Sequence, residues 1–361
     1  MSERNASIDI AKGIGIVLVV FGHNWIIAHD HGELFRIIFS FHMPLFFFLS
    51  GAVLHHDTAF KDFLAFKVDA LLKPFFVVLS VWGLARIVLS GTDARTYLLG
   101  MLYGTGNTIE WVPLWYLPHL FLAILLAWII LRLTNHLRPG LLLPVFCAGI
   151  LLALGIITAH FCAGLDAQQF DRLNLLLGNR LHNFPGLPWS LDLIGISTAF
   201  ILLGYIMHEY VMRFSFQPWI FASTLILFAA LHFFFDETID LNMRLYGNWW
   251  ISTAQALLGI YLVLSISTCL QYAGSLGTAL AYLGTSSLFI MIFHSWIEWK
   301  IFGMLARWST SEYLNASLAF VAGLLLPLLL LSLVKKNKFL HGLLLPKTHI
   351  PKVRNTLDPN K

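Results

Sequence analysis

The chain has 361 residues, of which 58% are hydrophobic and only 12% are charged. A soluble domain carries about a quarter charged residues, so this composition excludes a soluble or disordered protein and indicates one integral membrane unit over residues 1–361. The net charge of +4 is small and the basic residues form no patch interleaved with aromatics, which argues against nucleic acid as a partner. Three scattered cysteines form neither a disulfide framework nor a zinc pattern, and we expect no metal site.

Ten apolar stretches are long enough to cross a bilayer, because a helix needs about 20 apolar residues to span roughly 30 Å of hydrocarbon. Their apolar side chains lie on all faces, which favours an all-α, polytopic membrane protein. The ninth stretch is the weakest, because residues 284–287 dilute it. The predicted spans are 10–28, 35–54, 70–90, 111–131, 141–160, 190–208, 217–235, 249–268, 279–297 and 314–334.

The positions of the basic residues orient this bundle. Ten spans put both termini on one side, and a cytoplasmic N-terminus places roughly two thirds of the 23 basic residues inside, in line with the positive-inside rule. We therefore expect an N-in, C-in bundle over about 8–334 and a short basic cytoplasmic tail over 335–361. The sequence shows no internal repeat of the kind found in many transporters.

Three ionisable residues of the first span, Asp9, Lys12 and His23, share one face of the helix. At 100° per residue Lys12 lies about 20° and Asp9 about 40° from His23 around the helix, and about 16 Å of helix separates Lys12 from His23. Ionisable residues inside a membrane are costly and are therefore functional candidates by default. We expect Lys12 near the cytoplasmic surface and His23 past the midplane, although Asp9 and Lys12 can also form a plain i, i+3 ion pair.

The second span carries His42, followed by Pro44. The connection between the first two spans is short, which predicts an antiparallel hairpin with His23 and His42 at similar depth and close together. Pro44 can bend the second helix and free a backbone carbonyl beside these histidines. A single membrane histidine can also serve only as a hydrogen bond between helices, an alternative that stays open for His42.

The ordered set Asp9-x2-Lys12-x10-His23, followed by Phe41-His-Met-Pro-Leu-Phe-Phe-Phe-Leu-Ser-Gly51, resembles the acyltransferase-3 membrane O-acyltransferases, and within them the short, fucose-O-acetylase-like branch. The resemblance covers about residues 5–335. The sequence departs from the family at Lys12, where many members carry Arg, at Lys67 and Lys73, which replace an Arg-x-x-Arg motif, and at His119, a position that is usually apolar. Further segments in family order are Lys73-Pro74, 114–118, 187–192 and 283–294.

The resemblance implies that an acyl group, usually acetyl, moves from cytoplasmic acetyl-CoA to a sugar hydroxyl of a surface polysaccharide or its lipid-linked precursor, at a bacterial inner membrane. His23 is then the general base, and His42 either polarises the thioester carbonyl or orients His23. A covalent acyl-histidine is the other route. The expected acyl-CoA site consists of Lys12, Asp9, Lys73 and Trp115, with Arg132 or Arg138 as further candidate cations for the phosphates.

We expect the acceptor at the longest outer loop, 161–189, because long ordered loops are usually functional. Trp189 offers a sugar an aromatic face, although it can also be a plain membrane-interface anchor. The loop's polar side chains are Asp166, Asp171, Arg172, Asn174, Asn179, Arg180, His182 and Asn183. The outer part of the ninth span adds His294, Trp296 and Glu298 as further candidates.

Two other functions remain open at the level of sequence. One is a transporter or channel whose membrane histidines hold a proton or a metal. The groups His29-Asp30-His31 and His55-His56 resemble metal ligands, but they lie at opposite ends of the second span and so cannot form one site. The other is a non-catalytic acyl-CoA sensor, which would need Lys12 but not His23. Neither the oligomeric state nor the acceptor sugar follows from the sequence.

Overall fold

The computed structural model describes residues 5–55, 57–137, 140–165, 167–178, 181 and 184–347. Helices form most of this part of the chain, and its only strands, β1 (Ile239–Asp240) and β2 (Leu245–Tyr246), pair as one antiparallel hairpin. In the hairpin Ile239 pairs with Tyr246 and Asp240 with Leu245. The all-α class is confirmed.

The helices are numbered in the order in which they follow one another along the chain. Up to residue 137 they are α1 (Ala6–Gly22), α2 (Trp25–Asp30), α3 (Glu33–Phe39), α4 (His42–Ala52), α5 (Phe60–Lys67), the π-helix η1 (Val68–Leu72), α6 (Lys73–Ser90), α7 (Ala94–Tyr103), the 3-10 turn η2 (Val112–Trp115) and α8 (Tyr116–Leu137). From residue 142 onward they are α9 (Leu142–Ala163), η3 (Ala167–Phe170), α10 (Asp171–Leu176), η4 (Pro188–Leu193), α11 (Ile194–Ile206), α12 (His208–Met212), α13 (Pro218–Phe234), α14 (Trp249–Leu270), α15 (Ser275–Thr285), α16 (Ser287–Leu305), α17 (Glu312–Lys336) and α18 (Lys338–Leu344).

Eight helical segments within the described residues are long and apolar enough to cross a membrane, and Pro218–Phe234 is a shorter apolar helix. Only 22% of the apolar stretch of Leu142–Ala163 is buried inside the protein, so most of this helix presents hydrocarbon surface that suits lipid. The polytopic membrane class is thus confirmed, whereas a count of ten spans is not. The eight segments are Glu33–Ala52, Phe60–Ser90, Val112–Leu137, Leu142–Ala163, Pro188–Ile206, Trp249–Leu270, Ser287–Leu305 and Glu312–Lys336.

Two expected spans, 10–28 and 279–297, are broken in the structure. The first ends as α1 at Gly22, and α2 starts only at Trp25, because the Asn24 side chain caps α2 and donates to the carbonyl of Ala316, 2.8 Å away. The other breaks at Ser286, between α15 and α16, and α16 then continues to Leu305. The polar stretch that weakened the ninth span in the sequence is therefore a helix break.

The second expected span is also broken, between α3 and α4. Pro44 lies in the first turn of α4 and has no N–H to bond the carbonyl of Ser40, so a continuous helix would lack a hydrogen bond there. Phe41 leaves the helical region instead, with φ −142°, and α4 begins at His42. The bend predicted at Pro44 is present, and it determines the position of His42 at the start of α4.

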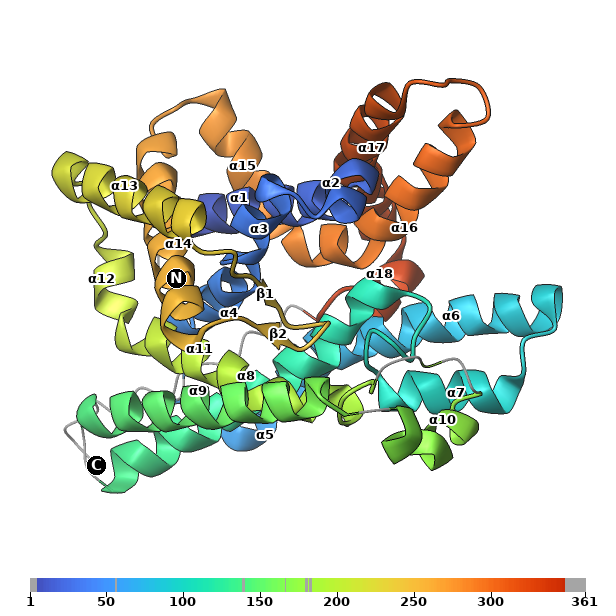
Figure 1. Ribbon diagram of the computed structural model, residues 1–361, viewed down its shortest axis with the longest axis horizontal. Coiled ribbons are helices and arrows are strands. Elements are labelled where there is room, and N and C mark those ends of the chain that lie inside the picture. The colour runs from blue at the N-terminus through green and yellow to red at the C-terminus, as the bar shows by residue number, and fades with distance from the viewer. Residues whose placement is uncertain are drawn as a thin grey trace.

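Helix α1 lies close to α15 because glycines form the contact. A Cβ at Gly284 would overlap the carbonyl oxygen of Asp9, and one at Gly13 would overlap the carbonyl oxygen of Leu280. Helix α1 also packs against α4, α14 and α16. In Figure 1 the hairpin β1–β2 lies near the middle of the view, below α1 and α3. The polar face of α1 is thus enclosed by protein rather than exposed to lipid.

Candidate functional site

A cavity of about 300 Å³ follows the polar face of α1. Its walls come from α1, the break between α3 and α4, the start of α8, the break between α15 and α16, and the hairpin β1–β2. Asp9, Lys12 and His23 all line it, as their shared helical face predicts. The cavity therefore joins the Lys12 end, where Asp9 also lies, to the His23 end about 16 Å further along the helix.

His23 is the C-cap residue of α1, and one of its ring nitrogens is engaged in a hydrogen bond. Its Nδ1 lies 2.8 Å from the carbonyl oxygen of Val19. A carbonyl oxygen only accepts hydrogen bonds, so Nδ1 carries the proton and Nε2 of the neutral ring keeps its lone pair. The ring lines the cavity, so the structure presents a proton acceptor there.

Two more histidines, His42 and His294, line the cavity beside His23. The His294 and His23 rings lie 5.3 Å apart between centroids, and His42 is close enough to His23 to interact with it electrostatically. The sequence therefore placed His23 and His42 together correctly. Within the chain as described, these three rings gather at the His23 end.

His42 and His294 repeat the arrangement of His23. The Nδ1 of His42 lies 3.0 Å from the carbonyl oxygen of Ile38, and that of His294 lies 2.9 Å from the carbonyl oxygen of Met291. Each neutral ring thus keeps a lone pair on Nε2, although the Nε2 of His294 is buried without a hydrogen-bond partner in the described residues. In this tautomer His42 can receive a hydrogen bond from a hydroxyl or from protonated His23. It cannot donate one to a thioester carbonyl.

The Lys12 end of the cavity combines one cation with small polar groups. Thr285 and Ser287, at the break before α16, line the cavity with Lys12. Lys67 of α5 is near enough for like-charge interaction with Lys12, which strengthens the positive potential in this region. Trp115 also lines the cavity and is only 6% exposed.

Lys73 and Arg132 are not among the residues that line the cavity. The Nζ of Lys73 pairs with Asp69 at 2.7 Å and donates to the carbonyl of Leu345 at 2.7 Å, which ties α6 to the chain after α18. Arg132 lies over the ring of Trp128 on α8. Arg138 is outside the described residues.

Sequence reasoning missed two side chains of the hairpin, Asp240 and Asn242, which line the cavity. Oδ1 of Asp240 accepts from the backbone amide of Met243 at 3.1 Å. Burial raises the pKa of the Asp240 carboxyl, while that amide and the nearby His23 oppose the shift. The Oδ1 of Asn242 is buried with no hydrogen-bond partner in the described part of the chain. In the sequence this hairpin is only a short polar connection between two apolar stretches.

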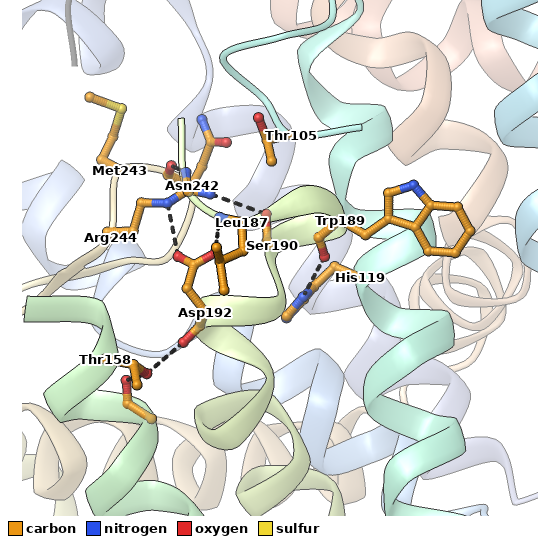
Figure 2. Close-up of polar contacts among 12 residues, drawn as sticks. Thr105, His119, Thr158, Leu187, Trp189, Ser190, Asp192, Asn242, Met243 and Arg244 are labelled. Atoms are coloured by element: carbon orange, nitrogen blue, oxygen red, sulfur yellow. Dashed lines mark hydrogen bonds and ion pairs between the residues drawn. The ribbon is translucent and has the colours of Figure 1, made fainter. Parts of the chain in front are cut away.

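A buried ion pair holds the hairpin in place (Figure 2). The Arg244 Nε donates to Oδ2 of Asp192 at 3.1 Å, and the two side chains are 2% and 0% exposed. Arg244 also donates to the carbonyl of Asn242 at 2.6 Å and to the Ser190 hydroxyl at 3.3 Å. Oδ1 of Asp192 accepts from the amide of Leu187 at 2.8 Å. Segment 187–192, weak as a motif alone, is thus the anchor of the hairpin.

Comparison with known protein families decides the assignment. The model of the acyltransferase domain, acyltransferase 3, matches residues 5–335. The chain belongs to the acyltransferase-3 family. Neither curated proteins nor solved structures gave a match. The family and the apolar helices together make the protein a membrane acyltransferase.

In this acyltransferase the loop 161–189, expected to bind the acceptor, does not line the cavity where it is described. The indole of Trp189 donates to the carbonyl of Leu102 at 2.9 Å, and Asn174 bonds the backbone of Leu181. Trp189 thus ties the end of the loop to α7, and Asn174 joins two parts of the loop to each other. Asp166, Asn179, Arg180, His182 and Asn183 lie outside the described residues.

The other candidates of the acyltransferase sequence pack between helices. Trp296 stacks on Trp111 at 5.5 Å between ring centroids, and Glu298 lies 3.5 Å from the amide of Asn24. His119 stands where the family is usually apolar, and its Nε2 forms a hydrogen bond with the Ser197 hydroxyl at 2.7 Å that joins α8 to α11. Its Nδ1 lies 3.3 Å from the carbonyl oxygen of Trp189 (Figure 2). In the described ranges, no group of three or more His, Cys, Asp or Glu side chains is arranged to hold a metal ion.

Proposed function

We propose that this acyltransferase moves an acetyl group from cytoplasmic acetyl-CoA to a hydroxyl of a surface polysaccharide, or of its lipid-linked precursor, at a bacterial inner membrane. The observation that carries the proposal is the single cavity that joins Lys12 to His23. When acetyl-CoA is held by its phosphates at one end of this passage, its long pantetheine arm carries the thioester to a base at the other end.

The donor end needs positive charge for phosphate, and Lys12 with nearby Lys67 supplies it. An ammonium group neutralises phosphate as a point charge, without the bidentate fork of an arginine. The indole of Trp115 adds an apolar surface to the passage. On this proposal the donor enters from the cytoplasmic side, where the predicted topology places Lys12.

The proposed chemistry is a direct transfer. The acceptor hydroxyl oxygen attacks the thioester carbonyl carbon while Nε2 of His23 takes the hydroxyl proton. The bond from carbon to sulfur then breaks, and His23 returns the proton to the leaving sulfur, so the products are an ester and free CoA thiol. Tyr116 lines the cavity and its hydroxyl is a donor for the developing oxyanion, whereas the Ser50 hydroxyl donates to the carbonyl of Phe46 at 2.7 Å.

The test is acetyl transfer by the purified chain in proteoliposomes, with acetyl-CoA outside and glycosides as acceptors. His23→Asn keeps an amide that can bond the Val19 carbonyl but has no base at the Nε2 position. We expect it to lower kcat by about 10² to 10⁴, the usual contribution of a general base. His160→Asn is the matched control, because His160 makes the same i−4 contact, to Ile156, on α9 away from the cavity.

Equal activity of His23→Asn and wild-type protein would refute the base assignment. A wild-type protein that neither transfers nor hydrolyses acetyl-CoA, but drives ion flux in the same liposomes, would instead support the transporter. In cells, mass spectrometry of surface glycans with and without the protein identifies the acetylated sugar.

A further inference from the structure

We infer that Asp240 and Asn242 of the hairpin form the acceptor subsite and select an uncharged sugar over an acidic one. The inference rests on the proposed function, because it assigns the acceptor of that same reaction. It also moves the acceptor site from the loop 161–189, where the sequence predicted it, to the turn between β1 and β2.

The first reason is position. Asp240 and Asn242 leave the same turn and line the cavity at the His23 end, where Asp240 is near enough to His23 for an electrostatic interaction. Phe39, whose ring centroid is 5.9 Å from that of His23, adds an aromatic face to the same wall. A hydroxyl held by the turn is therefore beside the base.

The second reason is unused hydrogen-bonding capacity. A carboxylate accepts several hydrogen bonds and a carboxamide both donates and accepts, the combination that neighbouring sugar hydroxyls require. The Oδ1 of Asn242 has no partner in the part of the chain that the structure describes, although it is buried. That oxygen lies against Gly106, where an added Cβ would be 2.0 Å from it, so Asn242 lines the subsite through its other atoms.

The third reason is charge, which defines the class of acceptor. Apart from histidines, the only cation that lines the cavity in the described chain is Lys12, at the opposite end. Arg244 is near Asp240 but is engaged by Asp192. An acidic sugar would therefore meet the carboxylate of Asp240 with no cation to compensate, and like-charge contact lowers affinity strongly. A neutral pyranoside meets no such penalty.

The experiment compares pairs of acceptors that differ only in charge. Methyl glucuronamide and methyl glucuronide form one pair, and the corresponding galacturonamide and galacturonide the other, so that no member carries a C6 hydroxyl. The readout is kcat/KM for acetyl transfer from acetyl-CoA in proteoliposomes, with acetyl-CoA hydrolysis measured in parallel. We expect the wild-type protein to favour the neutral member by about tenfold or more.

Asp240→Asn keeps an Oδ1 that can accept from the Met243 amide, so the turn is preserved while the charge is removed. We expect the preference for the neutral glycoside to fall towards one, and hydrolysis of acetyl-CoA, measured in parallel, separates this change in preference from any effect of the lost charge on His23. Asn242→Ala should lower kcat/KM for both members of a pair and leave their ratio unchanged. The matched control is Asp236→Asn, which removes an exposed carboxylate four residues before Asp240 that pairs with Arg36 outside the cavity, and it should leave the preference between the two glycosides as in wild type.

The inference is overturned if the wild-type protein favours the acidic glycoside, or if Asp240→Asn leaves the ratio as in wild type. It is also overturned if the protein hydrolyses acetyl-CoA but acetylates neither neutral glycoside. A protein with no acetyl-CoA turnover at all would refute the proposed function itself, and the two failures are thereby told apart.

Discussion

The buried pair of Asp192 and Arg244 provides the sharpest test of how the hairpin is held. Arg244→Met removes three hydrogen bonds from the guanidinium, to Asp192, Ser190 and the carbonyl of Asn242. It also leaves the Asp192 carboxylate charged and 0% exposed, with the Leu187 amide still donating to Oδ1. Removing one member of a buried ion pair lowers stability by about 3–5 kcal/mol, and we expect that range here.

The assay is a double-mutant cycle measured by unfolding in mixed detergent micelles. Asp192→Asn keeps an oxygen for the Leu187 amide, and the double variant with Arg244→Met leaves no buried charge. We therefore expect the double variant to be more stable than Arg244→Met alone, with a coupling energy of about 1–3 kcal/mol between the sites. Additive effects, or a loss below about 1 kcal/mol for Arg244→Met, would show that the pair does not hold the hairpin.

Three further predictions concern the Lys12 end of the cavity, the contact between α1 and α15, and the orientation in the membrane. Lys12→Ala should raise the KM for acetyl-CoA about tenfold or more while Lys12→Arg restores it, and an equal rise in the acceptor KM would contradict the phosphate role. Gly284→Ala should destabilise the protein by about 1–3 kcal/mol in micelle unfolding because its Cβ overlaps the carbonyl of Asp9, whereas Gly149→Ala, with open space around it, should not destabilise. A periplasmic reporter fused after Lys361 should stay silent, and a strong signal would reverse the predicted orientation.

The candidate site could be predicted in part because some of its geometry is local. The positions of Lys12 and His23 on one face follow from helical periodicity alone, and Pro44 indicates the helix break next to His42. The tautomers of the histidines were not predictable, because they depend on which backbone carbonyl each ring reaches after the helices break.

What the sequence determined by itself was the membrane class, the apolar helices and the polar face of the first helix, since hydrophobicity and a 3.6-residue period are properties of neighbouring residues. Only the tertiary structure decided that Lys73 ties α6 to the chain beyond α18, and that a hairpin of two-residue strands brings Asp240 and Asn242 to the cavity that His23 lines. The hairpin is fixed by Arg244 and Asp192, 52 residues apart in the chain. Such a contact leaves no periodic trace in the sequence, because the two segments meet only after the helices between them have packed.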